Sequence, residues 1–306
     1  MVKKLVNIIL AAWITISLQG QISPVTDQYI LNPMSINPAF TGNRGALNFA
    51  AFYRHQWVGV TGAPETFTLA IDAPLLDAKL GLGLIIISDK IGVTKENTYK
   101  TNYSYKINFE KGILSLGLGA GIITTNTAWS ELTVLDQGDD FYLSDSRVFV
   151  VPDFSFGVYF SNQKYFAGLS IPKLLEYNFD YNKNKYTTKI KPADYYYLFN
   201  TGYLFDISSK TKFLPSTLIS FSPGMKLQYD INAYLGLFDK LWIGASYRNN
   251  PSFYGFFQYK INTQLKLAYS YNYDFGKLSS YSNGSHEIML RYEFRYKIEV
   301  VNPLIF

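Results

Sequence analysis

The chain has 306 residues, of which 48% are hydrophobic, 17% aromatic and 17% charged. Soluble domains usually carry about 25% charged residues, so this chain is poor in charge, and its excess lies in 26 tyrosines and 23 phenylalanines. Such a composition excludes an intrinsically disordered chain. The sequence has no cysteine, which excludes a disulfide scaffold, a thiolate zinc site and a cysteine nucleophile.

The N-terminus has the charge pattern of an export signal. Lys3 and Lys4 precede an apolar stretch between Leu5 and Leu18, and the small residue Gly20 follows. The stretch is about 14 residues long, whereas a membrane-spanning helix needs about 20. We therefore expect a signal peptide over residues 1–20, with an anchor helix as the alternative. Without Lys3 and Lys4, the 28 basic residues become 26 against 23 acidic ones, and a net charge of about +3 predicts no nucleic-acid partner.

Beyond residue 45, apolar and polar residues alternate over long stretches. Side chains of a strand point to opposite faces in turn, so this pattern predicts strands with one apolar face. The alternating stretches extend over roughly 10–13 residues, whereas globular strands centre on about 5–6 and membrane-spanning strands need about 9–11. In the last stretch, one face carries Ile288, Leu290, Tyr292, Phe294 and Tyr296.

These features predict an all-β fold, an antiparallel transmembrane β-barrel of about fourteen strands over residues 46–306. A soluble β-sandwich is the alternative, but its strands would be shorter and its core more aliphatic. The expected strands cover 46–54, 65–73, 79–88, 97–109, 112–124, 147–160, 164–171, 194–206, 212–221, 224–236, 240–249, 252–261, 264–275 and 284–297.

The connections between the expected strands alternate in length. Those after even-numbered strands are short, whereas the longest, about 125–147 and 172–193, follow odd-numbered strands. Outer-membrane barrels have short periplasmic turns and long external loops. We therefore expect both chain ends on the periplasmic side and the long loops outside the cell.

Glycines recur on one face of two expected strands, opposite a face that is rich in leucine. If the leucines face lipid, the glycines face the lumen, where the missing side chains would let another backbone approach closely. The alternative is that they only permit curvature of the barrel wall. The predicted lumen-facing residues are Gly81, Gly83, Gly117, Gly119 and Gly121.

Residues suited to catalysis are few. The two histidines, His55 and His286, are not accompanied by a GxSxG nucleophile motif, so we predict no catalytic residue. The acidic residues Asp136, Asp139 and Asp140 do not match a calcium-binding loop, and a solvated loop is the simpler interpretation. We therefore predict no metal site and no cofactor.

The segment 21–45 differs from the expected strands. It contains two Asn-Pro steps, Asn32-Pro33 and Asn37-Pro38, which favour turns and oppose a regular helix or strand. Its apolar residues, among them Tyr29, Leu31 and Phe40, are too many for a free linker. We expect it to lie in the periplasm or to enter the lumen of the barrel.

Several blocks of the sequence resemble the PorP/SprF family. The opening block is Gln28-Tyr29-Ile30-Leu31-Asn32-Pro33 through Ile36-Asn37-Pro38-Ala39-Phe40-Thr41-Gly42, and the next is Tyr53-Arg54-His55-Gln56-Trp57. The resemblance covers nearly the whole chain after the signal. It implies an outer-membrane β-barrel of the type IX secretion system that works with secretion components, or with one large secreted surface protein such as a gliding adhesin.

Two functional hypotheses follow. The first is a non-catalytic subunit that supports export or surface attachment of that large protein, in contact with type IX secretion components and outer-membrane lipid. The second is a channel for small or hydrophobic solutes, whose lumen would carry Lys266, Arg291, Glu293 and Arg295. For the first hypothesis, the predicted partner-binding residues are Asn32, Pro33, Asn37, Pro38, Arg54, Gln56 and Trp57.

Overall fold

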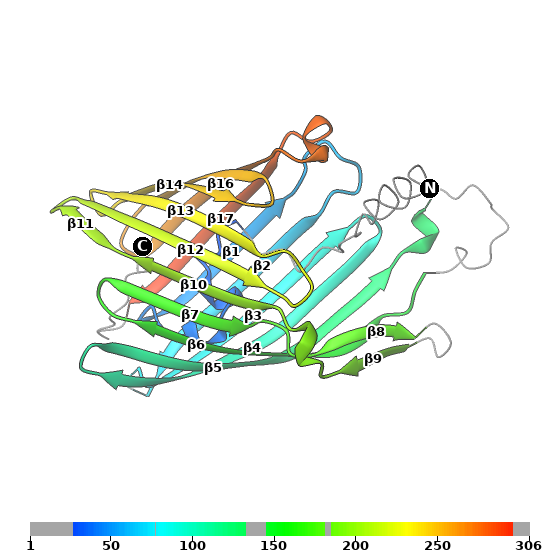
Figure 1. Cartoon of the computed structure of the whole chain (residues 1–306), viewed down its shortest axis with the longest axis horizontal. Helices are drawn as coiled ribbons and strands as arrows, with labels where there is room; N and C mark the ends of the chain where they lie inside the picture. The colour runs from blue at the N-terminus through cyan, green and yellow to red at the C-terminus, as the bar shows by residue number, and fades with distance from the viewer. Residues whose placement is uncertain (1–26, 77, 133–144, 181–184, 296–306) are drawn as a thin grey trace, which may run out of the picture.

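The protein forms a closed antiparallel β-barrel in a computed structural model that describes residues 27–76, 78–132, 145–180 and 185–295 (Figure 1). The signal peptide expected over residues 1–20 lies outside the described residues, as do Asp136, Asp139 and Asp140. Among the described residues, no helix is long and apolar enough to cross a membrane.

Fourteen antiparallel strands build the barrel wall, and β1 pairs with β17 to join the two ends of the sheet. Both β10 and β11 pair with β12, so they are two pieces of one wall strand that is interrupted at Leu204. The bounds are β1 (Ala46–His55), β2 (Glu65–Leu75), β3 (Leu80–Ile91), β4 (Thr94–Phe109), β5 (Gly112–Thr127), β6 (Phe149–Ser161), β7 (Tyr165–Ile171), β10 (Tyr197–Tyr203), β11 (Phe205–Ser208), β12 (Thr211–Phe221), β13 (Gln228–Leu237), β14 (Leu241–Arg248), β15 (Ser252–Lys260), β16 (Leu265–Asp274) and β17 (Ser285–Arg295).

The predicted fold class and strand number are confirmed, and each predicted span overlaps one wall strand. The alternation of side chains explains this agreement. In β5, Leu116 and Leu118 are exposed on the outside of the barrel, whereas Ser115 is fully buried on the inside. A barrel in a membrane needs such an apolar outer face, and a polar inner face is compatible with a lumen that contains other polar groups.

The two ends of the barrel differ in the length of their connections, as expected. At one end, here called the short-turn end, the connections are 76–79, 110–111, 162–164, 209–210, 238–240 and 261–264. The opposite end, here called the long-loop end, carries 56–64, 128–148, 172–196 and 275–284 as its longest connections. Three of these contain short 3-10 helices, namely η3 (Trp129–Glu131), η5 (Pro192–Asp194) and η6 (Lys277–Ser280).

A small hairpin at the long-loop end was not predicted. Its strands, β8 (Glu176–Asp180) and β9 (Lys185–Lys189), form a separate two-stranded sheet. Each strand is only five residues long, too short for alternation to stand out. The hairpin packs on the end of β6 through aromatic rings, since Phe149 lies 5.2 Å from both Phe179 and Tyr186 between ring centroids.

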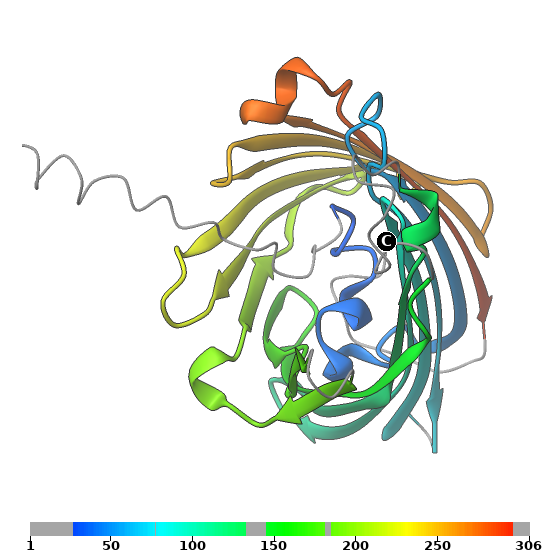
Figure 2. The same cartoon turned by 90° about the vertical axis from the view of Figure 1, so that its right-hand side faces the viewer.

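Residues 27–45, here called the plug, lie inside the lumen (Figure 2). Each Asn-Pro step starts a 3-10 helix, η1 (Pro33–Ser35) and η2 (Pro38–Phe40), with proline at a position where no backbone N–H is needed. The plug begins near the long-loop end, where Asp27 contacts Arg54 of β1, and it enters β1 at the short-turn end. The buried apolar core of the molecule is therefore the contact between the plug and the barrel wall.

Close approach of the plug to the wall depends on a glycine of β5. A Cβ added at Gly117 would collide with the backbone of Ala39 in η2. No side chain other than hydrogen leaves room for this contact, because the obstacle is backbone and cannot rotate away.

We predict that Gly117→Val lowers barrel stability by about 1–3 kcal/mol, the usual cost of overpacking. Gly255→Val is the matched control, because a Cβ at Gly255 of β15 meets no atom within 4 Å. Thermal unfolding of the purified barrel, followed by circular dichroism or by gel migration of heated samples, measures the difference. Equal stability of the two variants would contradict the close packing of η2 on β5.

Candidate functional site: the plugged lumen

A buried ionic cluster holds the start of the plug. The carboxylate of Asp27 lies 3.3 Å from Arg54 of β1 and accepts a hydrogen bond of 2.9 Å from Asn272 of β16. Its backbone N–H donates to Glu287 of β17 at 3.1 Å, and Arg248 of β14 lies 3.6 Å from the same carboxylate. Both carboxylates of the cluster and the Arg54 side chain are at most 5% exposed. Buried charges need such partners, since an unpaired one costs several kcal/mol.

The next two plug residues also bond to the wall, at β13 and β17. The Tyr29 hydroxyl accepts a hydrogen bond of 2.7 Å from Asn232 of β13, and the Gln28 side chain donates to the backbone carbonyl of Glu287 at 2.8 Å. Burial raises the pKa of Tyr29 well above its ordinary value, and the charge of Asp230 raises it further. Tyr29 therefore stays a neutral phenol at any physiological pH.

The middle of the plug is fixed by the second Asn-Pro step. Asn37 caps η2 by accepting a hydrogen bond from the backbone N–H of Ala39 at 2.9 Å. Its amide also donates to the carbonyl of Val158 in β6 at 3.0 Å. Phe40 packs edge-on against Tyr159 of β6, with 5.4 Å between ring centroids. The Asn37-Pro38 step thus starts the 3-10 helix, caps it, and attaches it to the barrel wall.

Two arginines converge on one carbonyl of the plug. Arg44 donates to the backbone oxygen of Leu31 at 2.5 Å, and Arg291 of β17 donates to the same oxygen. Arg44 also lies over the ring of Phe40, 5.1 Å from its centroid. Burial lowers the pKa of Arg44, and the charge of Asp72 acts in the opposite direction.

At the short-turn end, the plug backbone bonds to polar side chains of the wall. The N–H of Gly42 donates to Asp72 of β2 at 2.9 Å, and the ammonium of Lys106 in β4 donates to the carbonyl of Gly42 at 2.6 Å. Ser104 donates to the carbonyl of Thr41 at 2.7 Å. Irregular backbone inside a lumen has no strand partner, so these side chains satisfy it.

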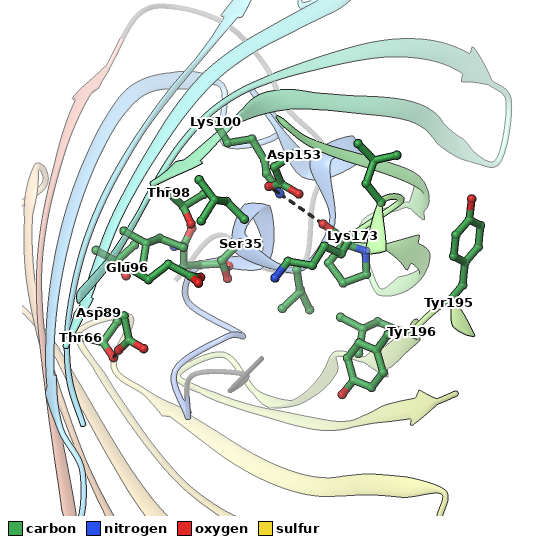
Figure 3. Close-up of a pocket in the computed structure, with 18 of the residues that line it drawn as sticks. Ser35, Thr66, Asp89, Glu96, Thr98, Lys100, Asp153, Lys173, Tyr195 and Tyr196 are labelled. Atoms are coloured by element: carbon green, nitrogen blue, oxygen red, sulfur yellow. Dashed lines mark hydrogen bonds and ion pairs between the residues drawn. The ribbon is translucent and has the colours of Figure 1, made fainter. Parts of the chain in front are cut away.

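Between the plug and the long connections lies a cavity of about 410 Å³, here called the lumenal cavity (Figure 3). Ser35 and Ile36 of the plug form part of its lining, together with residues of β1 to β6 and of the connection 172–196. Figure 3 shows Asp89 and Glu96 on one side and Tyr195 and Tyr196 on the other. A smaller cavity of about 30 Å³, lined by Asn102 and Ser155, lies next to it.

The predicted lumen-facing glycines lie on the inner face, and three of them contact the plug. A Cβ at Gly81 would meet Thr41, one at Gly83 would meet Met34, and one at Gly117 would meet Ala39. By contrast, a Cβ at Gly119 or Gly121 would meet residues of the wall itself. Two further glycines that approach Asn37 of the plug, Gly157 and Gly168, were missed because each stands alone in its strand.

The predicted partner-binding residues occupy three places. Four of them lie in the plug, namely Asn32, Pro33, Asn37 and Pro38. Arg54 is buried near the end of β1, and Gln56 is buried just after that strand. Trp57 is half-buried at the long-loop end. Asn32 and Arg54 both line the lumenal cavity, whereas Trp57 does not. The buried ones contact this chain itself, so their partner-binding role stays a prediction. Asp27, Arg248 and Glu287, which complete the ionic cluster, were not singled out.

The two histidines lie on the outer side of the neighbouring strands β1 and β17. His286 lies on the outer side of β17 with its ring nitrogen 2.7 Å from the Tyr269 hydroxyl, and His55 pairs with it in register across β1 and β17. In the part of the chain that the structure describes, no three His, Cys, Asp or Glu residues are grouped to hold a metal ion.

Solved structures of similar shape are outer-membrane barrels. The toluene transporter TbuX of Ralstonia pickettii is 9% identical with a TM-score of 0.51, over 91% of this chain and 96% of that chain. The monoaromatic hydrocarbon channel CymD is 11% identical with a TM-score of 0.49, over 91% and 95%. Omp33 of Acinetobacter baumannii is 11% identical with a TM-score of 0.46, over 82% and 99%. At such low identity the likeness to TbuX shows the fold alone.

No curated protein matches the sequence. A family model does match it, over residues 18–292, which include the plug and nearly all of the barrel wall. That family is described as type IX secretion system membrane protein PorP/SprF. The closed barrel and this family of type IX secretion membrane proteins together place the chain in the outer membrane. The chain belongs to the PorP/SprF family of type IX secretion system membrane proteins.

Proposed function

We propose that the chain is a non-catalytic, plugged barrel that supports export or cell-surface attachment of a large secreted protein, such as a gliding adhesin. It does so in association with other type IX secretion components. The single observation that carries this proposal, beyond family membership, is the plug, which lies inside the lumen and is bonded to the wall along its length. A barrel of this kind offers rigid surfaces for partners instead of an aqueous path.

The strength of the plug attachment supports this reading. Removing one partner of a buried ion pair typically costs about 3–5 kcal/mol, and the plug contributes to a cluster of such pairs. Apolar plug residues add burial, among them Ile30, Leu31 and Phe40, which are at most 1% exposed. Spontaneous release of the plug is therefore rare, and the seated plug is the working state.

The long-loop end is the proposed partner surface, and we place it outside the cell. Trp57 lies there with a left-handed backbone, at φ 45°, and its N–H donates to Ser285 at 3.2 Å. A non-glycine residue held in this conformation is a rigid feature of the rim. The buried residues Asn32, Pro33, Asn37, Pro38, Arg54 and Gln56 would act indirectly, by holding the plug and the rim in place.

A channel for small or hydrophobic solutes is the second candidate function. The lumenal cavity favours it, because part of its lining is apolar, including Phe52, Ile87 and Leu198. The two functions differ in one physical property, the passage of ions through the lumen. An open pore conducts steadily, and a seated plug does not.

We predict that the unmodified barrel in a planar lipid bilayer shows no steady conductance, whereas Arg54→Met shows intermittent openings. The substitution leaves Asp27 and Glu287 buried without their shared cation, which weakens the plug. Lys212→Met is the matched control, because it breaks an exposed ion pair with Asp239 at the short-turn end. Steady conductance of the unmodified barrel would instead establish the channel function.

We predict that Trp57→Ala reduces the amount of the secreted partner at the cell surface several-fold, while the level of folded barrel is unchanged. Phe238→Ala is the control, because it removes an exposed aromatic ring at the short-turn end. Immunoblots of whole cells and of heated and unheated outer-membrane fractions measure both quantities. Unchanged export in the Trp57 variant would remove the rim from the proposed partner surface.

Affinity purification of a tagged barrel from gently extracted outer membrane, with mass spectrometry, tests the partners directly. We expect a very large surface protein and periplasmic or lipoprotein secretion components to accompany the barrel. A barrel recovered alone would argue against the export role.

A further inference from the structure

The outer face of the barrel becomes polar at the long-loop end of three neighbouring strands. Along most of β3, β4 and β5, this face carries aliphatic or tyrosine side chains such as Leu82, Tyr103 and Leu118, which are exposed toward lipid. Nearer the long-loop end, the same faces carry six polar side chains in two adjacent register rows. These six residues, here called the outer patch, are Ser88, Asn97 and Thr124 in one row and Lys90, Lys95 and Asn126 in the next.

The length of the strands places the outer patch at the level of the lipid headgroups. Both β4 and β5 are 16 residues long, whereas a membrane-spanning strand needs about 9–11 residues. At the short-turn end, the outer face of β4 stays aromatic as far as Phe109, so the extra length lies at the long-loop end. The outer patch is therefore continuous with the lipid-facing band and lies just beyond it.

Two lysines of the outer patch lie directly opposite each other. Lys90 of β3 and Lys95 of β4 are partners in register, and both side chains are exposed on the outer face. Like charges directly opposite in a sheet repel each other. Within the described residues, neither lysine forms an ion pair with a carboxylate. A negatively charged group from outside the chain would relieve this repulsion.

Two carboxylates in this region have contacts of their own. Glu65, the register partner of Lys90 on β2, accepts a hydrogen bond from the Tyr53 hydroxyl at 3.2 Å. Asp145, on the connection that follows β5, accepts one from a serine hydroxyl of the same connection at 2.7 Å. Neither Asp145 nor the exposed Glu131 of that connection pairs with the two lysines. The outer patch thus keeps a local excess of positive charge.

The other members of the outer patch supply neutral hydrogen-bonding groups. The amide of Asn97 donates to the Thr124 hydroxyl at a long 3.4 Å. The side chains of Ser88 and Asn126 make no hydrogen bond in the part of the chain that the structure describes. Amides and hydroxyls both donate and accept, which matches the hydroxyl groups of a sugar. Ammonium groups form strong charge-assisted hydrogen bonds with phosphate oxygens.

We infer that the outer patch binds the phosphorylated sugar headgroup of a lipid in the leaflet at the long-loop end. One phosphate accepts hydrogen bonds from both Lys90 and Lys95, since side chains directly opposite in a sheet have Cβ atoms about 4.5–5.5 Å apart. The sugar contacts the amide and hydroxyl groups, and the acyl chains follow the lipid-facing band. The inference rests on the place of the chain in the outer membrane and not on the proposed role in export.

Lipid binding to the detergent-purified full-length barrel tests the outer patch. The probe is diphosphoryl lipid A in mixed micelles, and native mass spectrometry counts the lipid molecules that stay on the barrel. Lipid A from which a phosphatase has removed the phosphates is the control. We expect it to bind at least about tenfold more weakly, as for the loss of a charge-assisted contact. Added salt should weaken binding of the phosphorylated lipid, because exposed charges are screened.

Three paired variants locate the binding on the barrel. Lys90→Gln with Lys95→Gln should lower the affinity for diphosphoryl lipid A about tenfold or more, because both ammonium groups are lost. Lys90→Arg with Lys95→Arg should retain the affinity, since guanidinium groups also bind phosphate. Lys210→Gln with Lys240→Gln is the matched control, because it removes two exposed lysines at the short-turn end and should leave the affinity unchanged.

Gel migration of heated and unheated samples confirms that each variant is a folded barrel. Three results would overturn the inference. Equal binding of the dephosphorylated lipid would mean that the acyl chains alone make the contact. Unchanged binding in the Lys90 and Lys95 glutamine variant would mean that the outer patch is only solvated. An equal loss in the Lys210 and Lys240 variant would mean that the lipid responds to the overall charge of the barrel.

Discussion

The interior of this barrel depends on the ion pairs that Asp27 makes inside the lumen. The plug begins with Asp27, and its carboxylate meets Arg54 of β1 and Arg248 of β14. Arg54 and Glu287 are buried on the inner faces of neighbouring strands. Without the plug, their pairing would lose the carboxylate between them, so plug and wall stabilise each other and form one cooperative unit.

Shape reinforces this electrostatic attachment. The plug is irregular, so its backbone groups need partners that no strand of the wall provides, and wall side chains such as Lys106 and Ser104 supply them. Glycines at the inner face bring wall backbone and plug backbone into contact at η2. Charge fixes where the plug begins, and close packing fixes the path that it follows toward β1.

The predictable part of this structure is the part that depends on local periodicity. Strands such as β4 and β5 are long, and the alternation of Tyr with polar residues in β4 and of Leu with Ser or Gly in β5 is visible in sequence. The plug contacts were not predictable, because they join residues far apart in the chain, as Asp27 joins Arg248. Repeated glycines such as Gly117 stand out as a pattern, whereas a single glycine such as Gly157 has a meaning only once Asn37 is known to lie against it.

The plug also decides what the rest of the lumen can do. Ser35 and Ile36 of the plug form part of the lining of the lumenal cavity. The cavity is therefore closed on that side only while the plug is seated. An open pore would hydrate charged residues of the lining such as Asp153 and Glu96. The same residues in a plugged barrel face a confined space that is partly apolar. The arrangement is therefore poorly suited to passing a solute through the lumen.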